Sequence, residues 1–489
     1  MPSERPHGSR PTRREVLGLG TAVAAAWAAR KPSRAARARP MRRPNILAIV
    51  TDDQGAQMGG VGTKGLATPH MDALAARGVL FQHHYCPFPS CSPARASIFT
   101  GLYPHAHGMT ANVHEFFGPA PPKRWLARTA PRNRLYKLRP GIPTLIELLA
   151  RAGYRTGITS KLHVVPHERL PFDGWVRGNR GTDVLEFVRG CGKRPFVLMQ
   201  NIRSPHRPFR QFISRAKRKL VDPCKVRVPD YLPDTELMRR DWAEYLTTIE
   251  ITDARVGETL KALRQSGRSD DTLVIFTGDN GPAFHRAKYS EYDFGLRTPL
   301  IVAGPGVKAG VRSKALASMT DLMPTILDYA GVELPKPVHG LSLRPVLQGR
   351  PGAKGHDLIV GEVHFGKGPK SYQGRGACDG RLLYIRRHNP SHPHPMPADN
   401  VAVKPWGNHS YQATIEAKDQ FPRPYELLKR WQGTPSAEEL FDVAADPWCM
   451  HDLTARANCS KDLARMRTAL DCWIRQTNDT DMQAAAANS

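Results

Sequence analysis

The sequence lacks three features that would point to common functional classes. Its eight cysteines include no Cys-x-x-Cys pair, so a zinc site built from cysteines is not expected. The apolar run at residues 16–29 is too short, and too rich in Ala and Gly, for a transmembrane helix. No signature of a nucleic-acid-binding module occurs, so we expect no nucleic-acid partner. Hydrophobic residues still make up 40% of the 489 residues, which indicates a globular chain with room for a large core and two domains.

Acidic residues are scarce as well. The chain has 44 Asp and Glu against 71 Lys and Arg, which gives a formal net charge of +27. Residues 1–43 hold eleven of the basic residues and two Glu, and the remainder is still strongly basic. Such a surface attracts polyanions, for example a sulfated glycan. A proteome that is rich in Arg throughout is an alternative explanation.

Residues 1–40 have the pattern of an export signal. The pair Arg13-Arg14 precedes the weakly apolar run at 16–29, and small residues suited to cleavage follow. We therefore expect export by the twin-arginine translocase and a periplasmic or secreted protein. This route carries folded proteins, so a cysteine could be modified in the cytoplasm before export. The alternative is a disordered basic tail.

The most informative stretch is residues 91–101, Cys-Ser-Pro-Ala-Arg-Ala-Ser-Ile-Phe-Thr-Gly. It predicts a loop that turns into a helix, because Pro93 suits the first helical turn. Cys91 then lies beside free backbone N–H groups that favour negative charge. Arg95 follows one turn later, so its guanidinium can return to the cysteine side. The pattern predicts a nucleophile that faces an anion-binding pocket, whereas a lone cysteine would indicate a buried structural residue.

Two predicted core strands end in acidic or amide residues. Asp52 and Asp53 follow the apolar run at residues 45–50, and Asp279 and Asn280 follow another after residue 271. Adjacent carboxylates repel each other unless a cation lies between them. Oxygen ligands of this kind suit calcium or magnesium better than zinc. Solvated turns are the alternative.

Basic residues follow two further predicted strands. Lys161 and His163 come after residues 155–159, and alternation places both on one side of an extended segment. An ammonium beside an imidazole suits an anionic oxygen and a proton transfer. His206 follows the strand at residues 195–201. An exposed basic strand end is the alternative for both segments.

The recurrence of this pattern carries more information than any single motif. Four separate strands each end in residues able to do chemistry, and Lys288 lies eight residues after Asn280. Open α/β sheets bind ligands at the carboxyl ends of their strands. We therefore expect these side chains to converge on Cys91.

Other cysteines and histidines allow several interpretations. If Cys91 is used in catalysis, seven cysteines remain, and Cys449, Cys459 and Cys472 could supply one disulfide bridge. Five histidines near the cysteine motif could form a second metal site or line the pocket. They are His83, His84, His105, His107 and His114.

The remaining segments are assigned from periodicity and composition. Residues 118–140, rich in Pro, Arg and Lys, are predicted to form a long surface loop, and residues 350–375 to link two domains. Helices are expected at 142–152, 241–265, from 321 onward and at 461–476, with short strands at 381–386 and 437–442.

The stretch at 91–101 resembles the signature of type I sulfatases, Cys-x-Pro-x-Arg followed by Thr-Gly. The resemblance runs from about Pro44 to the C-terminus and includes Lys161-x-His163. It implies the alkaline-phosphatase-like α/β fold, with a mostly parallel central sheet flanked by helices. After the signal expected at 1–40, it implies a catalytic domain at 44–375 and a smaller C-terminal α+β domain at 376–489.

The resemblance further implies a site and a mechanism. Cys91 would be oxidised to formylglycine by a formylglycine-generating enzyme or another maturase, and its hydrated form would attack sulfur. His206 would give a proton to the leaving group, and His163 would take one from the second hydroxyl. The implied catalytic residues are Cys91, Arg95, Lys161, His163, His206 and Lys288. The implied ligands of one calcium ion are Asp52, Asp53, Cys91, Asp279 and Asn280.

Residues 160–166, 171–173 and 271–276 resemble the heparan N-sulfatase (sulfamidase) branch of the family. A sulfated carbohydrate is therefore the expected substrate, with glucosamine N-sulfate favoured. Ser160 stands where the family usually has Gly, a change that we expect to be harmless. Lys288 stands where this branch has Arg, so activity as an aryl or carbohydrate O-sulfatase is the alternative. Rival functions are a phosphatase or phosphodiesterase, which normally has a Ser or Thr nucleophile and zinc, and a non-catalytic polyanion-binding protein. The oligomeric state is not predicted.

Overall fold

Eight strands form the larger sheet of the computed structural model, which describes residues 43–114, 123–176, 178–366, 371–389 and 409–486. The strand order is β4-β3-β5-β1-β6-β7-β2-β8. The strands from β4 to β6 run parallel, β7 is antiparallel to β6 and to β2, and β2 is parallel to β8. The prediction of a mostly parallel sheet is confirmed. The strands are β1 (Asn45–Thr51), β2 (Gly78–Tyr85), β3 (Arg155–Thr159), β4 (Gly174–Val176), β5 (Phe196–Ile202), β6 (Thr272–Gly278), β7 (Leu300–Ala303) and β8 (Val311–Ser318).

Strand β1 is buried on both faces, which explains its continuous apolar sequence. Ile46, Ala48 and Val50 belong to one hydrophobic cluster, and Leu47 and Ile49 to another. The alternation follows from the pleat of the strand, which directs successive side chains to opposite faces. The sheet therefore separates two hydrophobic cores.

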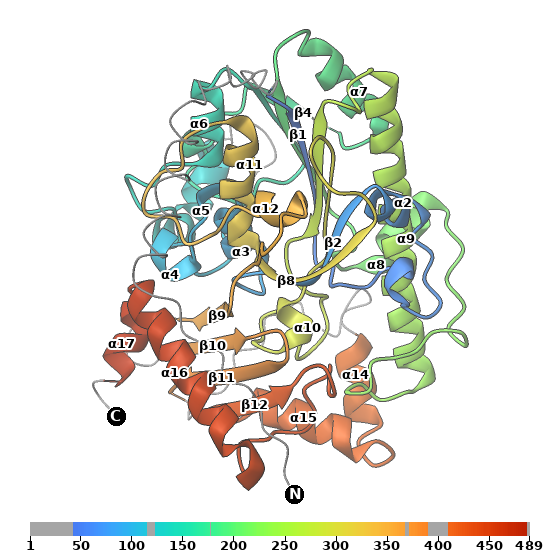
Figure 1. The fold of residues 1–489 in the computed structure, drawn as a ribbon. Coiled ribbons are helices and arrows are strands. Elements are labelled where there is room, and N and C mark those ends of the chain that lie inside the picture. Colours follow the sequence, from blue (N-terminus) through green and yellow to red (C-terminus); the bar gives the residue numbers. More distant parts are fainter. Residues whose placement is uncertain (1–42, 115–122, 177, 367–370, 390–408, 487–489) are drawn as a thin grey trace, which may run out of the picture. The chain divides into compact units, whose positions relative to one another are not determined.

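Helices cover both faces of this sheet (Figure 1). Three helices contribute Ile98, Leu145 and Ile326 to the cluster that contains Val50. Three other helices contribute Leu74, Val184 and Val256 to the opposite cluster. The first three helices are α3 (Cys91–Thr100), α6 (Leu145–Arg151) and α11 (Leu322–Ala330), and the others are α2 (Pro69–Ala76), α7 (Gly181–Gly190) and α9 (Glu236–Gln265).

Side-chain caps set the start of two of these helices. Thr144 and Glu147 form a capping box at the start of α6. Thr235 accepts a hydrogen bond from the backbone N–H of Met238, so α9 begins at Glu236, earlier than the apolar stripe from residue 241 predicts.

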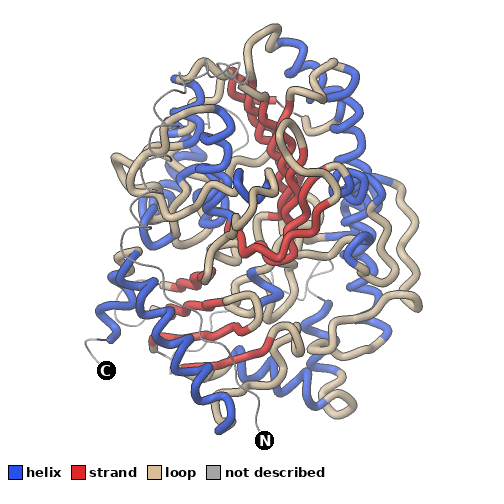
Figure 2. The backbone as a smooth tube through the Cα atoms, viewed as in Figure 1, coloured by secondary structure: helices blue, strands red, loops and turns tan. Residues whose placement is uncertain are grey.

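A second sheet contains four antiparallel strands in the order β12-β11-β10-β9 (Figure 2). Tyr384 and Leu440 from this sheet share a hydrophobic cluster with Met466, Leu470 and Trp473 of α16. The strands are β9 (Ile359–Phe365), β10 (Tyr372–Cys378), β11 (Leu382–His388) and β12 (Glu438–Asp442). The remaining helices are α4 (Pro104–His107), α5 (Lys123–Leu135), α8 (Phe209–Ala216), α10 (Asp293–Leu296), α12 (Arg344–Leu347), α14 (His409–Glu416), α15 (Pro422–Gln432), α16 (Ser460–Gln476) and α17 (Thr480–Ala486).

The structure corrects two segment predictions. Within 118–140, expected to be a surface loop, residues 123–135 form α5. Arg, Ala and Leu are good helix formers, and the Pro content was given too much weight. Within 350–375, expected to be a linker, residues 359–365 form β9 and residues from 372 onward begin β10. The Gly and Pro residues flank an apolar strand in that segment.

Four further expectations concern the chain as a whole. The described residues from 43 onward form one compact unit, and the division into domains at residue 375 stays a prediction. The predicted signal at 1–40 lies outside the described residues. Within the described ranges, no helix has both the length and the apolar character needed to cross a membrane. The structure forms no bridge among Cys449, Cys459 and Cys472, since all eight cysteines are free and Cys449 is buried away from solvent.

Candidate active site

The carboxyl ends of four neighbouring strands supply the site. Strands β3, β5, β1 and β6 are consecutive in the sheet and parallel, so their carboxyl ends share one edge. These are the strands that precede the predicted polar residues. Sheet order therefore brings together segments that lie more than 200 positions apart in the sequence, such as Asp53 and Asp279.

A buried cluster of potential metal ligands lies at this edge. One ligand atom from each of Asp52, Asp53, Cys91 and Asp279 lies within 4.8 Å of those of the others. The Cys91 Sγ atom lies 3.3 Å from Asp52 Oδ1 and 3.9 Å from Asp53 Oδ1. Asn280 donates from Nδ2 to Asp53 Oδ1 at 2.9 Å, and its own Oδ1 is buried without a hydrogen-bond partner among the described residues. Three carboxylates and an unsatisfied amide oxygen are a donor set that fits calcium.

Three buried cations balance the three carboxylates. Lys161 Nζ lies 2.8 and 2.7 Å from the two oxygens of Asp52. Lys288 Nζ lies 2.8 Å from Asp53 Oδ1. Arg95 donates from Nε to Asp279 Oδ2 at 2.8 Å. All six side chains are at most 6% exposed, so these charges interact in a poorly hydrated environment.

Helix α3 presents both Cys91 and Arg95 to this cluster. Cys91 is its first residue and Ser90 its N-cap, so the thiol lies at the end where backbone N–H groups lack helical partners. All ten residues of the helix are buried. Gly101 ends it with φ of 64°, a left-handed conformation that suits Gly.

Burial and charge perturb the acidity of these groups. Burial would raise the pKa of Asp52, but Lys161, His206 and Arg95 outweigh it and hold that pKa well below its ordinary value. Burial raises the pKa of Asp279 to about 6 against the opposing effect of Arg95. Burial, together with the charge of Asp52, raises the pKa of the Cys91 thiol well above its ordinary value. An unmodified Cys91 is therefore a protonated thiol and a poor nucleophile.

The two predicted catalytic histidines each have one nitrogen fixed by a backbone carbonyl. His163 donates from Nε2 to the Val113 carbonyl at 2.8 Å, and its Nδ1 is buried with no hydrogen-bond partner among the described residues. Burial and the charge of Lys161 lower the pKa of His163 well below its ordinary value, so the ring is neutral. His206 donates from Nδ1 to the Arg207 carbonyl, and its Nε2 lies 3.7 Å from Asp53 Oδ2. One ring nitrogen of His163 is thus available as a base, and one of His206 faces the carboxylates.

Sequence reasoning missed several residues that hold the site together. Asn201, at the end of β5, accepts a hydrogen bond from Arg95 at 2.6 Å. Arg207 forms a buried two-point ion pair with Asp241 of α9, at 2.8 and 2.6 Å. Asn112 accepts hydrogen bonds at 2.9 Å from the Ser90 hydroxyl and from the Ser92 backbone, on either side of Cys91. The position of Asn201 at a strand end was a usable signal, whereas nothing local indicated Asp241 or Asn112.

The five histidines near the cysteine motif do not form a second metal site. In the part of the chain that the structure describes, the acidic cluster is the one group of three or more ligating residues that comes close enough to hold an ion. His107 contacts the Ser97 hydroxyl at 3.1 Å, and His84 contacts that of Thr298 at 2.9 Å. His105 pairs with Glu362 at 2.5 Å. These residues support the structure around the site.

The comparisons with known proteins agree on one family. The family model described as Sulfatase matches residues 44–186 and 179–332. The chain is 31% identical to human N-sulphoglucosamine sulphohydrolase, over 91% of each protein. It is 23% identical to N-acetylglucosamine-6-O-sulfatase of Bacteroides thetaiotaomicron, over 90% of this chain and 88% of that protein.

The fold also matches solved structures. One, determined in complex with its substrate D-glucosamine-2-N,6-O-disulfate, superposes with a TM-score of 0.63 at 20% identity, over 90% of this chain and 99% of that one. This likeness supports the alkaline-phosphatase-like sulfatase fold. The family model and the human relative together cover the strands, α3 and the acidic cluster described above. The chain therefore belongs to the sulfatase family and is a sulfatase.

Proposed function

We propose that this sulfatase removes sulfate from a sulfated carbohydrate, with N-sulfated glucosamine as the favoured substrate. The observation that carries the proposal is the 31% identity with human N-sulphoglucosamine sulphohydrolase over nearly the whole chain. An O-sulfated sugar is the second candidate, because a relative at 23% identity is named for the 6-O-sulfate of N-acetylglucosamine. Both candidates share a glucosamine unit and a sulfuryl group.

The proposal includes a catalytic and a metal-binding set. Cys91, converted to formylglycine by a maturase, would supply a geminal diol as the nucleophile. Calcium, when bound, would neutralise negative charge on the sulfuryl group. The ligands would be Asp52, Asp53, Asp279, Asn280 and the modified Cys91. The unsatisfied Oδ1 of Asn280 supports this set, because a buried amide oxygen without a donor is costly unless a ligand uses it.

The other residues have roles that follow from their contacts. Arg95, Lys161 and Lys288 place three positive charges around the Cys91 side chain and would stabilise the sulfuryl oxygens. Nδ1 of His163 would accept a proton, because Nε2 is already committed to the Val113 carbonyl. Nε2 of His206 would give a proton to the leaving nitrogen or oxygen, since its Nδ1 is held by a carbonyl.

Two measurements test the proposal. Mass spectrometry of the Cys91 peptide from protein that was produced with a maturase should show an aldehyde in place of the thiol. Glucosamine N-sulfate and glucosamine 6-O-sulfate should then be assayed side by side. Turnover of the O-sulfate alone would overturn the N-sulfate preference, and turnover of phosphate esters alone would overturn the proposed substrate class.

Export completes the proposal. We assign the twin-arginine pattern at residues 1–40 to translocation after Cys91 has been modified and the chain has folded. Replacing Arg13 and Arg14 by Lys should retain the active protein in the cytoplasm. An unchanged periplasmic or secreted fraction would contradict this part.

A further inference from the structure

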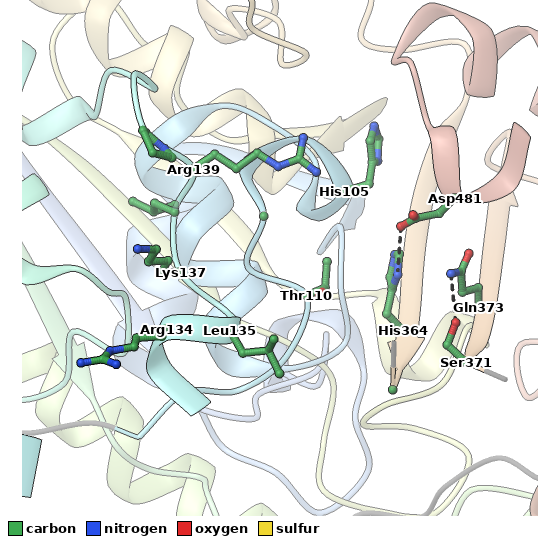
Figure 3. A pocket seen from close by; sticks show the side chains of 14 residues that line it. His105, Thr110, Arg134, Leu135, Lys137, Arg139, His364, Ser371, Gln373 and Asp481 are labelled. Carbon is green, nitrogen blue, oxygen red and sulfur yellow. Dashed lines mark hydrogen bonds and ion pairs between the residues drawn. The ribbon is translucent and has the colours of Figure 1, made fainter. Parts of the chain in front are cut away.

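A cavity of about 450 Å³ lies outside the acidic cluster (Figure 3). One wall comes from the end of α5, from the segment after it and from His105 and Thr110. The opposite wall comes from the ends of β9 and β10 and from Asp481. A volume of this size is typical of sites for small ligands. The groups lining it are mostly polar or charged, which suits a charged sugar better than an apolar molecule.

The charge of the cavity is predominantly positive. Arg134, Lys137 and Arg139 line it and are exposed, whereas Asp481 is its one acidic lining residue among those described. The Asp481 carboxylate lies 3.6 Å from His364 Nδ1, on the wall opposite these basic residues. In Figure 3 the Arg139 guanidinium extends across the cavity toward the side of Asp481. The cavity is therefore suited to a negatively charged group.

The basic wall is held by backbone contacts. Arg139 donates its backbone N–H to the His107 carbonyl at 3.0 Å, and Leu138 donates to the Val165 carbonyl at 2.9 Å. Gly108 has φ of 88°, and a Cβ atom there would lie 2.8 Å from Arg139 Cγ. The absence of a side chain at Gly108 thus leaves room for the stem of Arg139. A wall fixed in this way loses little conformational entropy when it binds a ligand.

The opposite wall offers a hydrogen-bond acceptor. Gln373 donates from Nε2 to Ser371 Oγ at 3.2 Å, and its Oε1 is buried without a hydrogen-bond partner among the described residues. A sugar hydroxyl is a donor that would satisfy this oxygen. Positive charge on one wall and an unsatisfied acceptor on the other match the chemistry of an acidic sugar.

Both walls are connected to segments that lie next to the start of α3, where Cys91 is located. Thr110 lies two residues before Asn112, which accepts hydrogen bonds from residues on either side of Cys91. On the other wall, the His364 ring stacks on Phe88 with centroids 6.0 Å apart, three residues before Cys91. Both walls are therefore linked to residues close to Cys91 in the sequence, and none of the lining residues belongs to the predicted catalytic or metal-binding set.

We infer that this cavity is a second anion-binding subsite, which holds a carboxylate or sulfate group on the sugar next to the one that loses its sulfate. The inference rests on the proposed function, because it assumes a substrate of at least two sugars. It assigns Arg139 and Lys137 to charge recognition and Gln373 to a sugar hydroxyl. The subsite would make the enzyme prefer acidic oligosaccharides over monosaccharides.

The test compares two charge-neutralising variants. Lys137→Gln combined with Arg139→Gln should lower the ratio of kcat/KM for an N-sulfated glucosamine–hexuronate disaccharide to that for the monosaccharide by about fivefold, since exposed charge contacts each contribute modestly. Its salt dependence on the disaccharide should also become weaker. Lys217→Gln combined with Lys219→Gln removes two exposed charges near the end of α8 and is the matched control. An equal fall in both variants, or in neither, would overturn the subsite.

Further arms identify the anion and separate the two proposals. If the fivefold effect of the Lys137 and Arg139 substitutions disappears with a carboxyl-reduced disaccharide, the subsite binds the carboxylate. If the effect appears only when the second sugar carries a sulfate, the subsite binds sulfate. If neither group matters, the inference is wrong. In a Cys91→Ala protein, which has no turnover, calorimetry should show that adding the Lys137 and Arg139 substitutions weakens binding of the disaccharide by the same factor of about five. If only O-sulfated sugars are turned over, the N-sulfate proposal fails, and the ratio is measured on O-sulfated disaccharides instead.

Discussion

The Asn201 side-chain oxygen lies 2.6 Å from an Arg95 guanidinium nitrogen, although 106 positions separate the two residues. Asn201 also donates from Nδ2 to the Thr159 carbonyl at 3.2 Å. It thereby joins the ends of β5 and β3 to the arginine that contacts Asp279. The preceding residue, Gln200, points to the other face of the strand and donates to the Thr259 hydroxyl of α9 at 2.7 Å.

Asn201→Ala should lower kcat/KM for the sulfated substrate by roughly tenfold or more. The variant leaves a buried guanidinium nitrogen without its acceptor, at a cost of about 1–3 kcal/mol in unfolding free energy, and it frees Arg95 to move. Gln200→Ala is the matched control, because it removes a buried amide from the same strand on the face away from the site. If the two variants lose similar amounts of stability and also lose equal amounts of activity, Asn201 has no special role in positioning Arg95.

Cys91→Ala should abolish turnover and leave the fold intact. The residue is small and fully buried, so the loss of one sulfur atom costs about 1–2 kcal/mol at most. Circular dichroism and the thermal midpoint check the fold, and a sulfate-release assay checks the activity. Cys86→Ala is the control, since Cys86 is equally buried and its thiol donates to the Gly295 carbonyl at 3.7 Å and not to a carboxylate of the cluster. Full activity in Cys91→Ala would end the formylglycine proposal.

Removing metal should abolish activity, and calcium should restore it better than zinc. The ligand set contains three carboxylates and an amide oxygen, which are hard ligands that match calcium. Calcium at about one hundred times its Kd should also raise the unfolding free energy by about 2.7 kcal/mol. Differential scanning calorimetry with and without chelator measures this shift.

Two Asn variants sharpen the metal test. Asn280→Ala should reduce the calcium-dependent shift in the thermal midpoint, because it removes the unsatisfied amide oxygen. Asn45→Ala should destabilise the protein but keep the shift, since Asn45 is at the opposite end of β1 and bonds to Asp271 at 2.7 Å. Stoichiometric zinc in fully active protein would favour the phosphatase alternative instead.

The buried pair of His105 and Glu362 should make stability depend on pH. Although burial opposes both charges, Glu362 raises the pKa of His105 above its ordinary value of 6.5, and His105 holds the pKa of Glu362 well below 4.5. The raised His105 pKa contributes stability that is complete below pH 6.5 and is lost as the pH rises through the folded-state value. The lowered Glu362 pKa contributes stability that is present above pH 4.5 and is lost as the pH falls.

Glu362→Gln should therefore flatten the pH profile of the unfolding free energy between about pH 5 and 8. Chemical denaturation at several pH values measures it, and His105→Gln provides a second variant in case Glu362→Gln folds poorly. His84→Gln is the control, because burial lowers the pKa of His84 to about 4 and keeps the ring neutral across this range. An unchanged slope in both Glu362→Gln and His105→Gln would show that the pair does not titrate as described.

Local patterns were sufficient for several of the individual elements. The continuous apolar run at Asn45–Thr51 predicted a strand buried on both faces, because such a strand contacts helices on either side. The spacing in residues 91–101 predicted that a loop turns into a helix just after Cys91, and in the structure the helix begins at Cys91 itself. Composition alone was misleading at 123–135, where Pro and Arg suggested a loop and a helix forms.

The sequence by itself determined which reactive side chains follow the strand ends and the start of a helix, because these positions follow from local periodicity. Only the tertiary structure decided their partners: Lys161 with Asp52, Lys288 with Asp53, and Arg95 with both Asp279 and Asn201. These pairs depend on the order of β3, β5, β1 and β6 in the sheet. That order is set by the packing of distant segments around two shared cores, which no local pattern encodes.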